Sequence, residues 1–259
     1  MSDDVKSKVQ AQFGASADLY ATSDVHAKGE SLAVLLELLE PQQSWRALDV
    51  ATGAGHTALT LAPHVAHVTA SDLTPGMLFK AGELADARGL TNFDTVPADA
   101  ESLPFEEDSY DLLTCRLAFH HFPDPSTALA EWARVLKPGG LLGLTDNFTV
   151  DDPPAADCYN AYEKLRDPSH HCVYSLARLH EMLEAAGFSI HATHTLTKEF
   201  EFHDWADRQH VSPSDKDKLI AMMRAIPAEL EPLFAPRWAD ETMYFSLWEA
   251  VIVARLPGA

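Results

Sequence analysis

The sequence predicts an α/β fold, in which helices cover both faces of a mostly parallel sheet. Short apolar segments alternate with helical patterns as far as about residue 147, an order typical of parallel strands joined by right-handed crossovers. A glycine-rich turn with Gly53 and Gly55 follows the first apolar segment, and Asp72 ends the second. Since ligands bind such sheets at the carboxyl edge of the strands, these positions predict a nucleotide-type cofactor site.

The predicted elements follow one another in a regular order. Leucines spaced three and four residues apart, with Pro41 just beyond them, predict a helix over residues 29–39, and an earlier helix is expected over residues 5–20. Strands are expected at residues 47–50, 68–71, 93–97, 112–116 and 141–145, with helices between them at 57–61, 77–88 and 125–136. Beyond residue 147, a loop is expected at 151–160, a helix at 175–186 and strands at 188–197 and 248–256.

The composition is that of one globular domain. With 259 residues, 46% of them hydrophobic, the chain can bury one full core. The formal net charge of −20 repels phosphates, so neither nucleic acid nor an anionic membrane surface is expected as a partner. Three cysteines without metal-like spacing, and the lack of an apolar leader or a membrane-spanning run, predict a cytoplasmic protein.

Two cofactor classes compete for the glycine-rich turn. The segment from Gly53 to Ala58 fits the G-x-G-x-x-A dinucleotide fingerprint, which points to an NAD-type dehydrogenase. The next eighty or so residues favour a different class, because further motifs follow the turn in a characteristic order.

Four motifs carry this second interpretation. They are LDVATGAGHTA at residues 48–58, SDLTPGML at 71–78, VPADAESLPFEEDSYDLLTCRLAFHHF at 96–122 and RVLKPGGLLGLTDN at 134–147. In this order they resemble the class I S-adenosylmethionine-dependent methyltransferases of the ubiquinone/menaquinone-biosynthesis C-methyltransferase (methyltransferase type 11) family, over about residues 9–147. The resemblance implies an enzyme that uses S-adenosylmethionine and releases S-adenosylhomocysteine.

The resemblance also implies the complete architecture. It predicts a Rossmann-like sheet of seven strands, whose last strand lies antiparallel beside the fifth. A single domain of residues 1–259 is expected, with a helical N-terminal cover at 1–43, a cofactor-binding core at 44–147 and the remaining sheet at 148–259. Residues 199–242 are then an insertion, either a helical lid over the pocket or an ordinary surface layer, that carries Trp205, Phe234 and Trp238.

The same resemblance assigns the cofactor residues. Asp49 is expected near the methionine end of the cofactor, Asp72 at the ribose hydroxyls and Asp99 at the adenine amino group. The full predicted set is Tyr20, Asp49, Ala51, Gly53, Gly55, Asp72, Leu73, Met77, Asp99, Ala100 and Arg116.

Several of these positions have a second interpretation. Asp49 either binds the ammonium group of the cofactor or only fixes the glycine turn. Arg116 either neutralises a carboxylate of the cofactor or acceptor, or forms a surface salt bridge. His56 replaces the third glycine that is usual in the family, which leaves the tightness of the turn open. The first helix, which covers the methionine end in the resembled enzymes, here implicates Phe13, Tyr20 and Ser23.

Two adjacent histidine pairs stand out. His120 and His121 follow the fourth strand, where this fold presents groups to the acceptor, so one imidazole is a candidate catalytic base. Their alternative role is to cap the next helix and to wall the cofactor. His170 and His171 are interpreted as a solvated loop, although His170 also continues a four-residue spacing of polar residues that Pro168 interrupts.

No metal is expected, because neither pair has the spacing of metal ligands. The alternative is a metal held by one histidine of each pair together with Asp146 and Asn147. The predicted function is methyl transfer to a small-molecule acceptor by in-line displacement, with a dehydrogenase and a non-catalytic regulatory protein as alternatives. The fold does not name the acceptor, so the sequence leaves open the acceptor atom and the oligomeric state.

Overall fold

The computed structural model of the protein describes residues 6–10 and 29–258, and a mixed sheet runs through them. Its strands are β1 (Arg46–Val50), β2 (His67–Asp72), β3 (Phe93–Pro97), β4 (Tyr110–Arg116), β5 (Leu136–Asn147), β6 (Ser189–Glu201), β7 (Arg237–Ala239) and β8 (Thr242–Arg255). The strand order is β3-β2-β1-β4-β5-β8-β6, and β7 pairs with β8 alone. The first five strands are parallel to one another, whereas β8 is antiparallel to both β5 and β6. The predicted parallel sheet with an antiparallel last strand is confirmed, and β7 is an eighth strand beyond the predicted seven.

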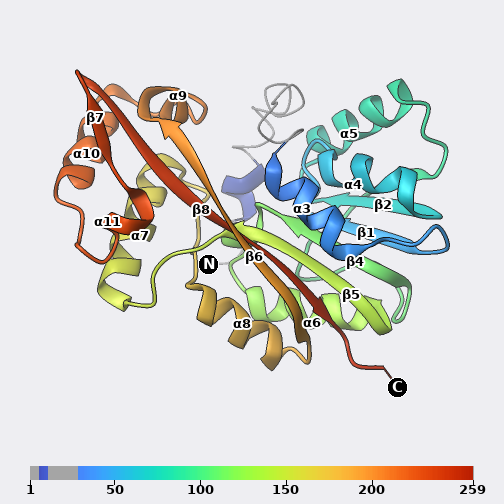
Figure 1. Ribbon diagram of the computed structural model, residues 1–259. Helices are drawn as coiled ribbons and strands as arrows, with labels where there is room; N and C mark the ends of the chain where they lie inside the picture. Colours follow the sequence, from blue (N-terminus) through green and yellow to red (C-terminus); the bar gives the residue numbers. More distant parts are fainter. Residues whose placement is uncertain (1–5, 11–28, 259) are drawn as a thin grey trace.

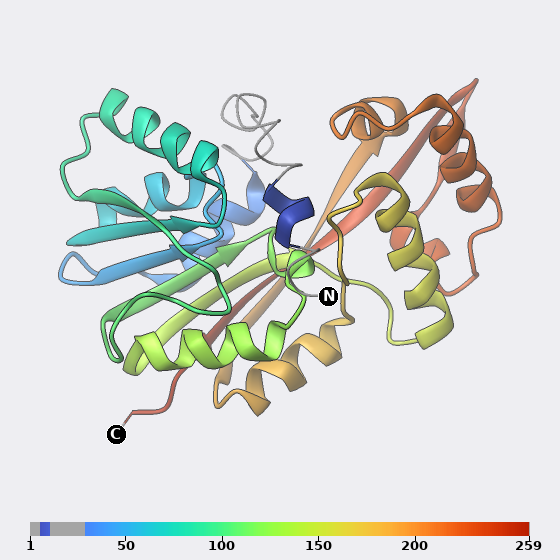
Figure 2. The ribbon, with the colours of Figure 1, turned by 180° about the vertical axis from the view of Figure 1, so that it is seen from behind.

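Helices cover both faces of this sheet (Figure 1). They are α3 (Glu30–Leu39), α4 (His56–Leu61), α5 (Pro75–Ala87), α6 (Pro125–Val135), α7 (Pro153–Arg166), α8 (Leu176–Ala185), α9 (Phe202–Asp207), α10 (Pro213–Arg224) and α11 (Glu231–Phe234). The first three lie on one face and α6 and α8 on the other, as Figure 2 also shows. Strand residues alternate between the faces: Ala47 packs in the core under α3 and α4, and Leu48 packs under α6 and α8. Within residues 6–10 and 29–258, no helix has both the length and the apolar character that a bilayer crossing requires.

A second core lies beyond the edge of these layers, in what we call the outer lobe. This lobe comprises α7, α9, α10, α11, β7 and the adjoining ends of the long strands β6 and β8 (Figure 1). The ring of Tyr159 stacks on that of Phe234 at 5.0 Å between centroids, and Tyr162 stacks on Trp205 at 5.5 Å. All four rings are buried, whereas Trp238 is 41% exposed. Two of the three aromatic residues noted in the insertion therefore belong to a packed core.

The structure corrects the prediction of a loop at residues 151–160. Helix α7 begins at Pro153, where the carboxylate of Asp152 accepts the N–H of Ala155 at 3.0 Å and caps the first turn. Proline is compatible with the first turn of a helix, because the N–H groups there have no partner within the helix. The helix ends at Arg166, so His170 does not continue its polar side.

Candidate active site

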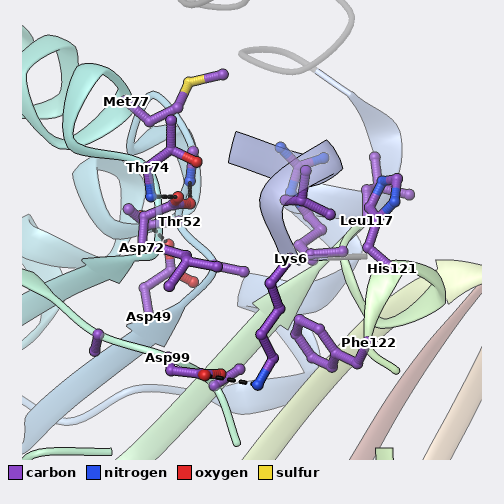
Figure 3. A pocket seen from close by; sticks show the side chains of 18 of the residues that line it. Lys6, Asp49, Thr52, Asp72, Thr74, Met77, Asp99, Leu117, His121 and Phe122 are labelled. Carbon is purple, nitrogen blue, oxygen red and sulfur yellow. Dashed lines mark hydrogen bonds and ion pairs between the residues drawn. The ribbon is translucent and has the colours of Figure 1, made fainter. Parts of the chain in front are cut away.

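A cavity lies at the carboxyl edge of β1, β2 and β4 (Figure 3). Lys6 and Val9 of the helical residues 6–10 close one side of it. Gly55 does not line it, and Tyr20, like Phe13 and Ser23, falls outside the residues that the structure describes. The other nine predicted cofactor residues all line this cavity: Asp49, Ala51, Gly53, Asp72, Leu73, Met77, Asp99, Ala100 and Arg116. We call it the first cavity.

The turn between β1 and α4 uses three residues with positive φ. The φ angles of Ala51, Gly53 and Gly55 are 52°, 55° and 85°. A Cβ atom at Gly55 would lie 2.8 Å from the Cβ of Ala81 on α5, whereas one at Gly53 would meet no atom within 4 Å. Gly55 thus permits α4 to pack closely on α5, and Gly53 leaves space beside the first cavity. The turn is tight even though His56 replaces the usual third glycine.

Asp72, at the end of β2, braces this turn. Its Oδ2 accepts the N–H of Gly53 at 2.8 Å, and its Oδ1 accepts the N–H of Thr74 at 2.8 Å. Burial raises the pKa of Asp72, although both hydrogen bonds favour the charged form. A carboxylate oxygen can accept more than one hydrogen bond, so Asp72 is able to accept ribose hydroxyls as well.

Asp49 lies buried beneath the turn, between two threonine hydroxyls. Thr52 Oγ1 donates to its Oδ2 at 2.5 Å, and Thr114 Oγ1 donates to its Oδ1 at 2.6 Å. Burial outweighs these bonds and raises the pKa of Asp49 to about 6. The two bonds favour the interpretation in which Asp49 fixes the glycine turn.

Asp99 follows β3 and faces Lys6 across the first cavity (Figure 3). Lys6 Nζ lies 2.6 Å from Asp99 Oδ2 and 2.6 Å from Glu101 Oε2. Gln10, in the same helical turn, donates from Nε2 to the carbonyl oxygen of Leu73 at 2.9 Å. Helical residues 6–10 therefore contact two sides of the cavity, at the end where the adenine amino group is expected.

Arg116 is the last residue of β4 and lines the first cavity. Its Nε donates to Thr57 Oγ1 at 3.0 Å. Burial lowers the pKa of Arg116, while the nearby carboxylates of Glu249 and Asp49 raise it. The Nη1 atom of Arg116 is buried, which argues against the alternative of a surface salt bridge.

A second, larger cavity lies between the sheet and the outer lobe. Its volume is about 1700 Å³ with its open mouth included, against about 1060 Å³ for the first cavity. Leu117 and His121 line both cavities, so the two are adjacent at the end of β4. Leu117 has a φ of 57°, a strained conformation for a residue with a Cβ that is often found at ligand sites.

His120 projects into the second cavity and is bonded to Asp146 at the end of β5. It lies in the 3-10 helix η2 (Phe119–His121), where its Nδ1 is 2.6 Å from Asp146 Oδ1 and its N–H donates to Oδ2 at 2.8 Å. Burial lowers the pKa of His120, but the attraction of Asp146 outweighs it, so the pKa lies above its ordinary value. Since Asp146 engages Nδ1, Nε2 is the ring nitrogen that remains for proton exchange with a bound molecule.

The two histidines beside it are neutral at pH 7. His121 Nδ1 lies 3.1 Å from the carbonyl oxygen of Ser169, and burial lowers the pKa of His121 to about 4. His170 Nε2 lies 2.8 Å from Asn160 Oδ1, and burial lowers the pKa of His170 strongly. The prediction of a solvated loop is wrong for His170, which is 2% exposed, and holds for His171, which is exposed.

These histidines do not form a metal centre in the described part of the chain. No group of three or more histidine, cysteine or acidic side chains there is arranged to hold a metal ion. One ring nitrogen of His120 is engaged by Asp146, and one of His170 by Asn160.

The sequence analysis missed several charged residues of the second cavity. Among them are Glu163 on α7, Lys198 on β6 and Glu249 on β8, which contacts Lys198 on the neighbouring strand. Glu163 and Glu249 are 5% and 4% exposed. A glutamate within the apolar run of β8 was the available signal for Glu249, since a buried carboxylate needs a partner.

The sheet order, the glycine turn and the carboxylates of Asp49, Asp72 and Asp99 at the carboxyl ends of β1, β2 and β3 define a class I S-adenosylmethionine-dependent methyltransferase. The family model described as a methyltransferase domain matches residues 48–144. The uncharacterized methyltransferase YcgJ of Bacillus subtilis (strain 168) is 35% identical over 211 residues, which cover 82% of this chain and 83% of YcgJ. The chain therefore belongs to the class I S-adenosylmethionine-dependent methyltransferases, a result that favours methyl transfer over the dehydrogenase and regulatory alternatives.

Solved structures agree with this family. The structure of YcgJ aligns with 88% of this chain and with 99% of the YcgJ chain, with a TM-score of 0.84 and 30% identity. A Bacillus halodurans C-125 protein assigned as a methyltransferase gives the same TM-score at 36% identity, covering 88% of this chain and all of its own. The demethylmenaquinone methyltransferase of Clavibacter sepedonicus is 37% identical over 129 residues, which are 50% of this chain and 52% of that enzyme.

Proposed function

We propose that the first cavity binds S-adenosylmethionine and that the second binds a small-molecule acceptor, which receives the methyl group. The observation that carries this proposal is the junction of the cavities at Leu117 and His121, with the His120–Asp146 pair on the side of the second cavity. A methyl group passed from one cavity to the other would cross this junction.

The chemistry of the first cavity fits the cofactor. Gly53 leaves room for a ligand beside the turn, and Asp72 and Asp99 supply carboxylates for the ribose hydroxyls and the adenine amino group. Leu73 and Met77 supply apolar surface next to Asp72. Asp99 now pairs with Lys6, so Lys6 must shift or share this carboxylate when an adenine ring is bound.

The residues of the second cavity fit the acceptor side of the reaction. Bound S-adenosylmethionine supplies an activated methyl group on a sulfonium sulfur, so the protein has to align a nucleophile, exclude water and remove a proton where one is present. Asp146 orients the imidazole of His120, whose Nε2 can take that proton as a general base. Neutral His121 lies beside it, with 4.1 Å between the two ring centroids, and walls the junction.

The outer lobe serves as the cover of the acceptor in this proposal. Glu163 and Arg166 from α7, and Trp205 and Gln209 from the segment around α9, line the second cavity together with His120. A cover packed around its own core limits the acceptor to a molecule that fits between lobe and sheet. This favours a small molecule over a macromolecule.

Calorimetry with three ligands tests the cofactor assignment. We expect S-adenosylmethionine and S-adenosylhomocysteine to bind with one site per chain, and NADH to show no comparable heat. An acceptor screen with methyl-labelled cofactor then tests the second half of the proposal, since labelled product must appear in a small-molecule fraction. Tight NADH binding without S-adenosylmethionine binding would refute the cofactor assignment, and label found only in protein or nucleic acid would refute the acceptor assignment.

A further inference from the structure

The second cavity has a charge pattern that narrows the chemistry of its ligand. We propose that the acceptor is an uncharged molecule with a free hydroxyl group, and that the methyl group is transferred to the oxygen of that hydroxyl. The inference rests on the methyl transfer and the acceptor cavity proposed above. It follows from three observations. The buried charges are paired, the aromatic ring of Trp205 is already covered by other groups, and a base faces the cavity.

Both buried cations of the second cavity have a carboxylate partner. Arg166 Nη1 lies 3.6 Å from Glu163 Oε2, and Lys198 Nζ contacts Glu249 Oε1. The four side chains are at most 17% exposed. An acceptor with a carboxylate or phosphate group would lose its hydration beside cations that are already neutralised, with two glutamates next to it. The third cationic side chain of the lining, Arg208, is exposed and keeps its hydration, so anionic acceptors are disfavoured at the buried part of the cavity.

The aromatic wall does not suit a cationic acceptor. Ammonium groups are recognised by open aromatic faces, but Trp205 is 2% exposed and the guanidinium carbon of Arg166 already lies 4.2 Å from its ring centroid. Tyr162 stacks on the same tryptophan. A cationic acceptor would also approach the imidazole of His120, whose protonated form Asp146 favours by raising its pKa above the ordinary value.

The polar atoms around Arg166 match a hydroxyl group. Arg166 Nε and Glu163 Oε1 are buried and have no hydrogen-bond partner among the described residues, and the same holds for Glu249 Oε2. Buried polar groups normally have partners, so we expect these side chains to turn toward a bound acceptor. A hydroxyl can accept from the arginine N–H and donate to a glutamate oxygen, whereas an ammonium group can only donate and a carboxylate can only accept.

The base that faces the cavity completes the argument. A hydroxyl keeps its proton at neutral pH, so its oxygen becomes a strong nucleophile only when a base removes that proton. In the proposed step, an oxygen lone pair forms the bond to the methyl carbon while the carbon–sulfur bond breaks and its electron pair stays on sulfur. The hydroxyl proton moves to His120 Nε2, and Asp146 stabilises the resulting imidazolium until the proton leaves to water. The products are a methyl ether and a neutral thioether.

A matched set of aromatic compounds tests this inference. The protein is saturated with S-adenosylhomocysteine, and binding is measured by calorimetry for one-ring and two-ring scaffolds that carry a hydroxyl, an amine or a carboxylate at one position. We expect the hydroxyl members to bind at least tenfold more tightly than their carboxylate and amine counterparts. With carbon-13-labelled S-adenosylmethionine, the product should show the methyl shift of an ether.

The Glu163→Gln variant tests the charge argument separately. It leaves Arg166 without its neutralising partner, so carboxylate members should gain at least tenfold in affinity relative to the hydroxyl members. Glu181→Gln is the matched control, because Glu181 pairs with Arg178 on α8 and lines neither cavity. Thermal unfolding confirms that both variants are folded.

The outcomes separate this inference from the proposed function. If S-adenosylmethionine binds but the methyl group is found on nitrogen or carbon, or if amine or carboxylate members bind best, the hydroxyl inference is overturned while methyl transfer stands. The inference also fails if no hydroxyl member binds, or if Glu163→Gln leaves the preference unchanged. If S-adenosylmethionine itself does not bind, the proposed function fails first.

Discussion

The first cavity takes its form from backbone turns close together in the chain, whereas the second takes its form from side chains of distant segments. Ala51 and Gly53 line the first cavity within a single turn, and Asp72 braces that turn through backbone N–H groups. The second cavity combines His120 with Glu163 of α7 and Glu249 of β8. A local motif therefore identifies the cofactor side, and only the folded chain assembles the acceptor side.

The two cavities are also expected to bind their ligands independently. Because Leu117 and His121 are the junction, a change deep in one cavity should leave binding in the other nearly unaltered. Each substitution described next changes one cavity, and a large effect on ligand binding in the other cavity would contradict this independence.

The largest effect is expected at His120. His120→Gln keeps a polar side chain next to Asp146 but removes the proton acceptor, so kcat should fall about 10²–10⁴-fold. The affinity for S-adenosylmethionine should change little, because His120 does not line the first cavity. Steady-state kinetics with the true acceptor and calorimetry with the cofactor measure the two quantities.

His180→Gln is the control for this substitution, since His180 lies on α8 and lines neither cavity. His121→Gln provides a second comparison, because neutral His121 walls the junction but is bonded to Ser169 through Nδ1. We expect it to affect cofactor affinity or stability more than kcat. Normal turnover in both His120→Gln and His121→Gln would eliminate the histidine base.

The next effect is expected on the cofactor side. Asp72→Ala removes a charge-assisted contact to the ribose, which should cost about 1.5–3 kcal/mol, or tenfold or more in cofactor affinity. Acceptor binding in the second cavity should stay near its original value. Calorimetry on the folded variant measures both affinities. Asp94→Ala is the control. That carboxylate is 50% exposed and bonds to His67 at the start of β2, the opposite end of the strand from Asp72. Unchanged cofactor affinity in Asp72→Ala would contradict the assignment.

The two glycines of the turn should respond differently to alanine. An alanine at positive φ costs about 1–2 kcal/mol at either position. Only Gly55→Ala adds a Cβ that would lie 2.8 Å from Ala81, so its free energy of unfolding should fall further than that of Gly53→Ala. Gly53→Ala instead places its methyl group in open space at the cavity wall and should mainly weaken cofactor binding. Urea unfolding of both variants measures the difference, and equal stabilities would argue against close packing of α4 on α5.

The sequence predicted the sheet well where strands are buried on both faces. β1, β2 and β4 lie close to their predicted bounds, since apolar runs mark such strands clearly. β3 also has its predicted bounds, although none of its residues is fully buried. β8 begins at Thr242 instead of near residue 248, because its first half is buried on one face only. Met243, Phe245 and Leu247 alternate with less buried residues there, a period-two pattern that was overlooked.

The acceptor side was harder to predict, for physical reasons. The prolines at the start of α7 suggested a loop, although Asp152 caps a helix there. The burial of His170 depends on Asn160, whose Oδ1 also accepts the N–H of Val173. Neither contact has a signature in the sequence, because the residues come together only when α7 folds against the segment after it.

The smallest effect concerns pH and tests the His120–Asp146 pair. His120 must be neutral to accept a proton, so kcat should fall as the pH drops through its pKa. Burial alone would place that pKa below its ordinary value of about 6.5, but the attraction of Asp146 raises it above. The acidic limb of the pH profile should therefore have its midpoint above about pH 6.5 in the parent, and at a lower pH in Asp146→Asn, where the largest opposing contribution to burial is removed.

The pH dependence of folding stability is a second test of the His120–Asp146 pair, and its sign is opposite to that of kcat. A raised folded-state pKa adds stability that is complete below the unfolded pKa of about 6.5 and is lost as the pH rises through the folded value. Between these two values the parent should become less stable with increasing pH while kcat increases, and Asp146→Asn should lose this decrease in stability. The nearby carboxylates of Glu163 and Asp167 also raise the pKa of His120, so the shift in Asp146→Asn measures the share due to Asp146. A profile whose midpoint does not move in this variant would show that His120 is not the titrating base, and that the second cavity obtains its base elsewhere.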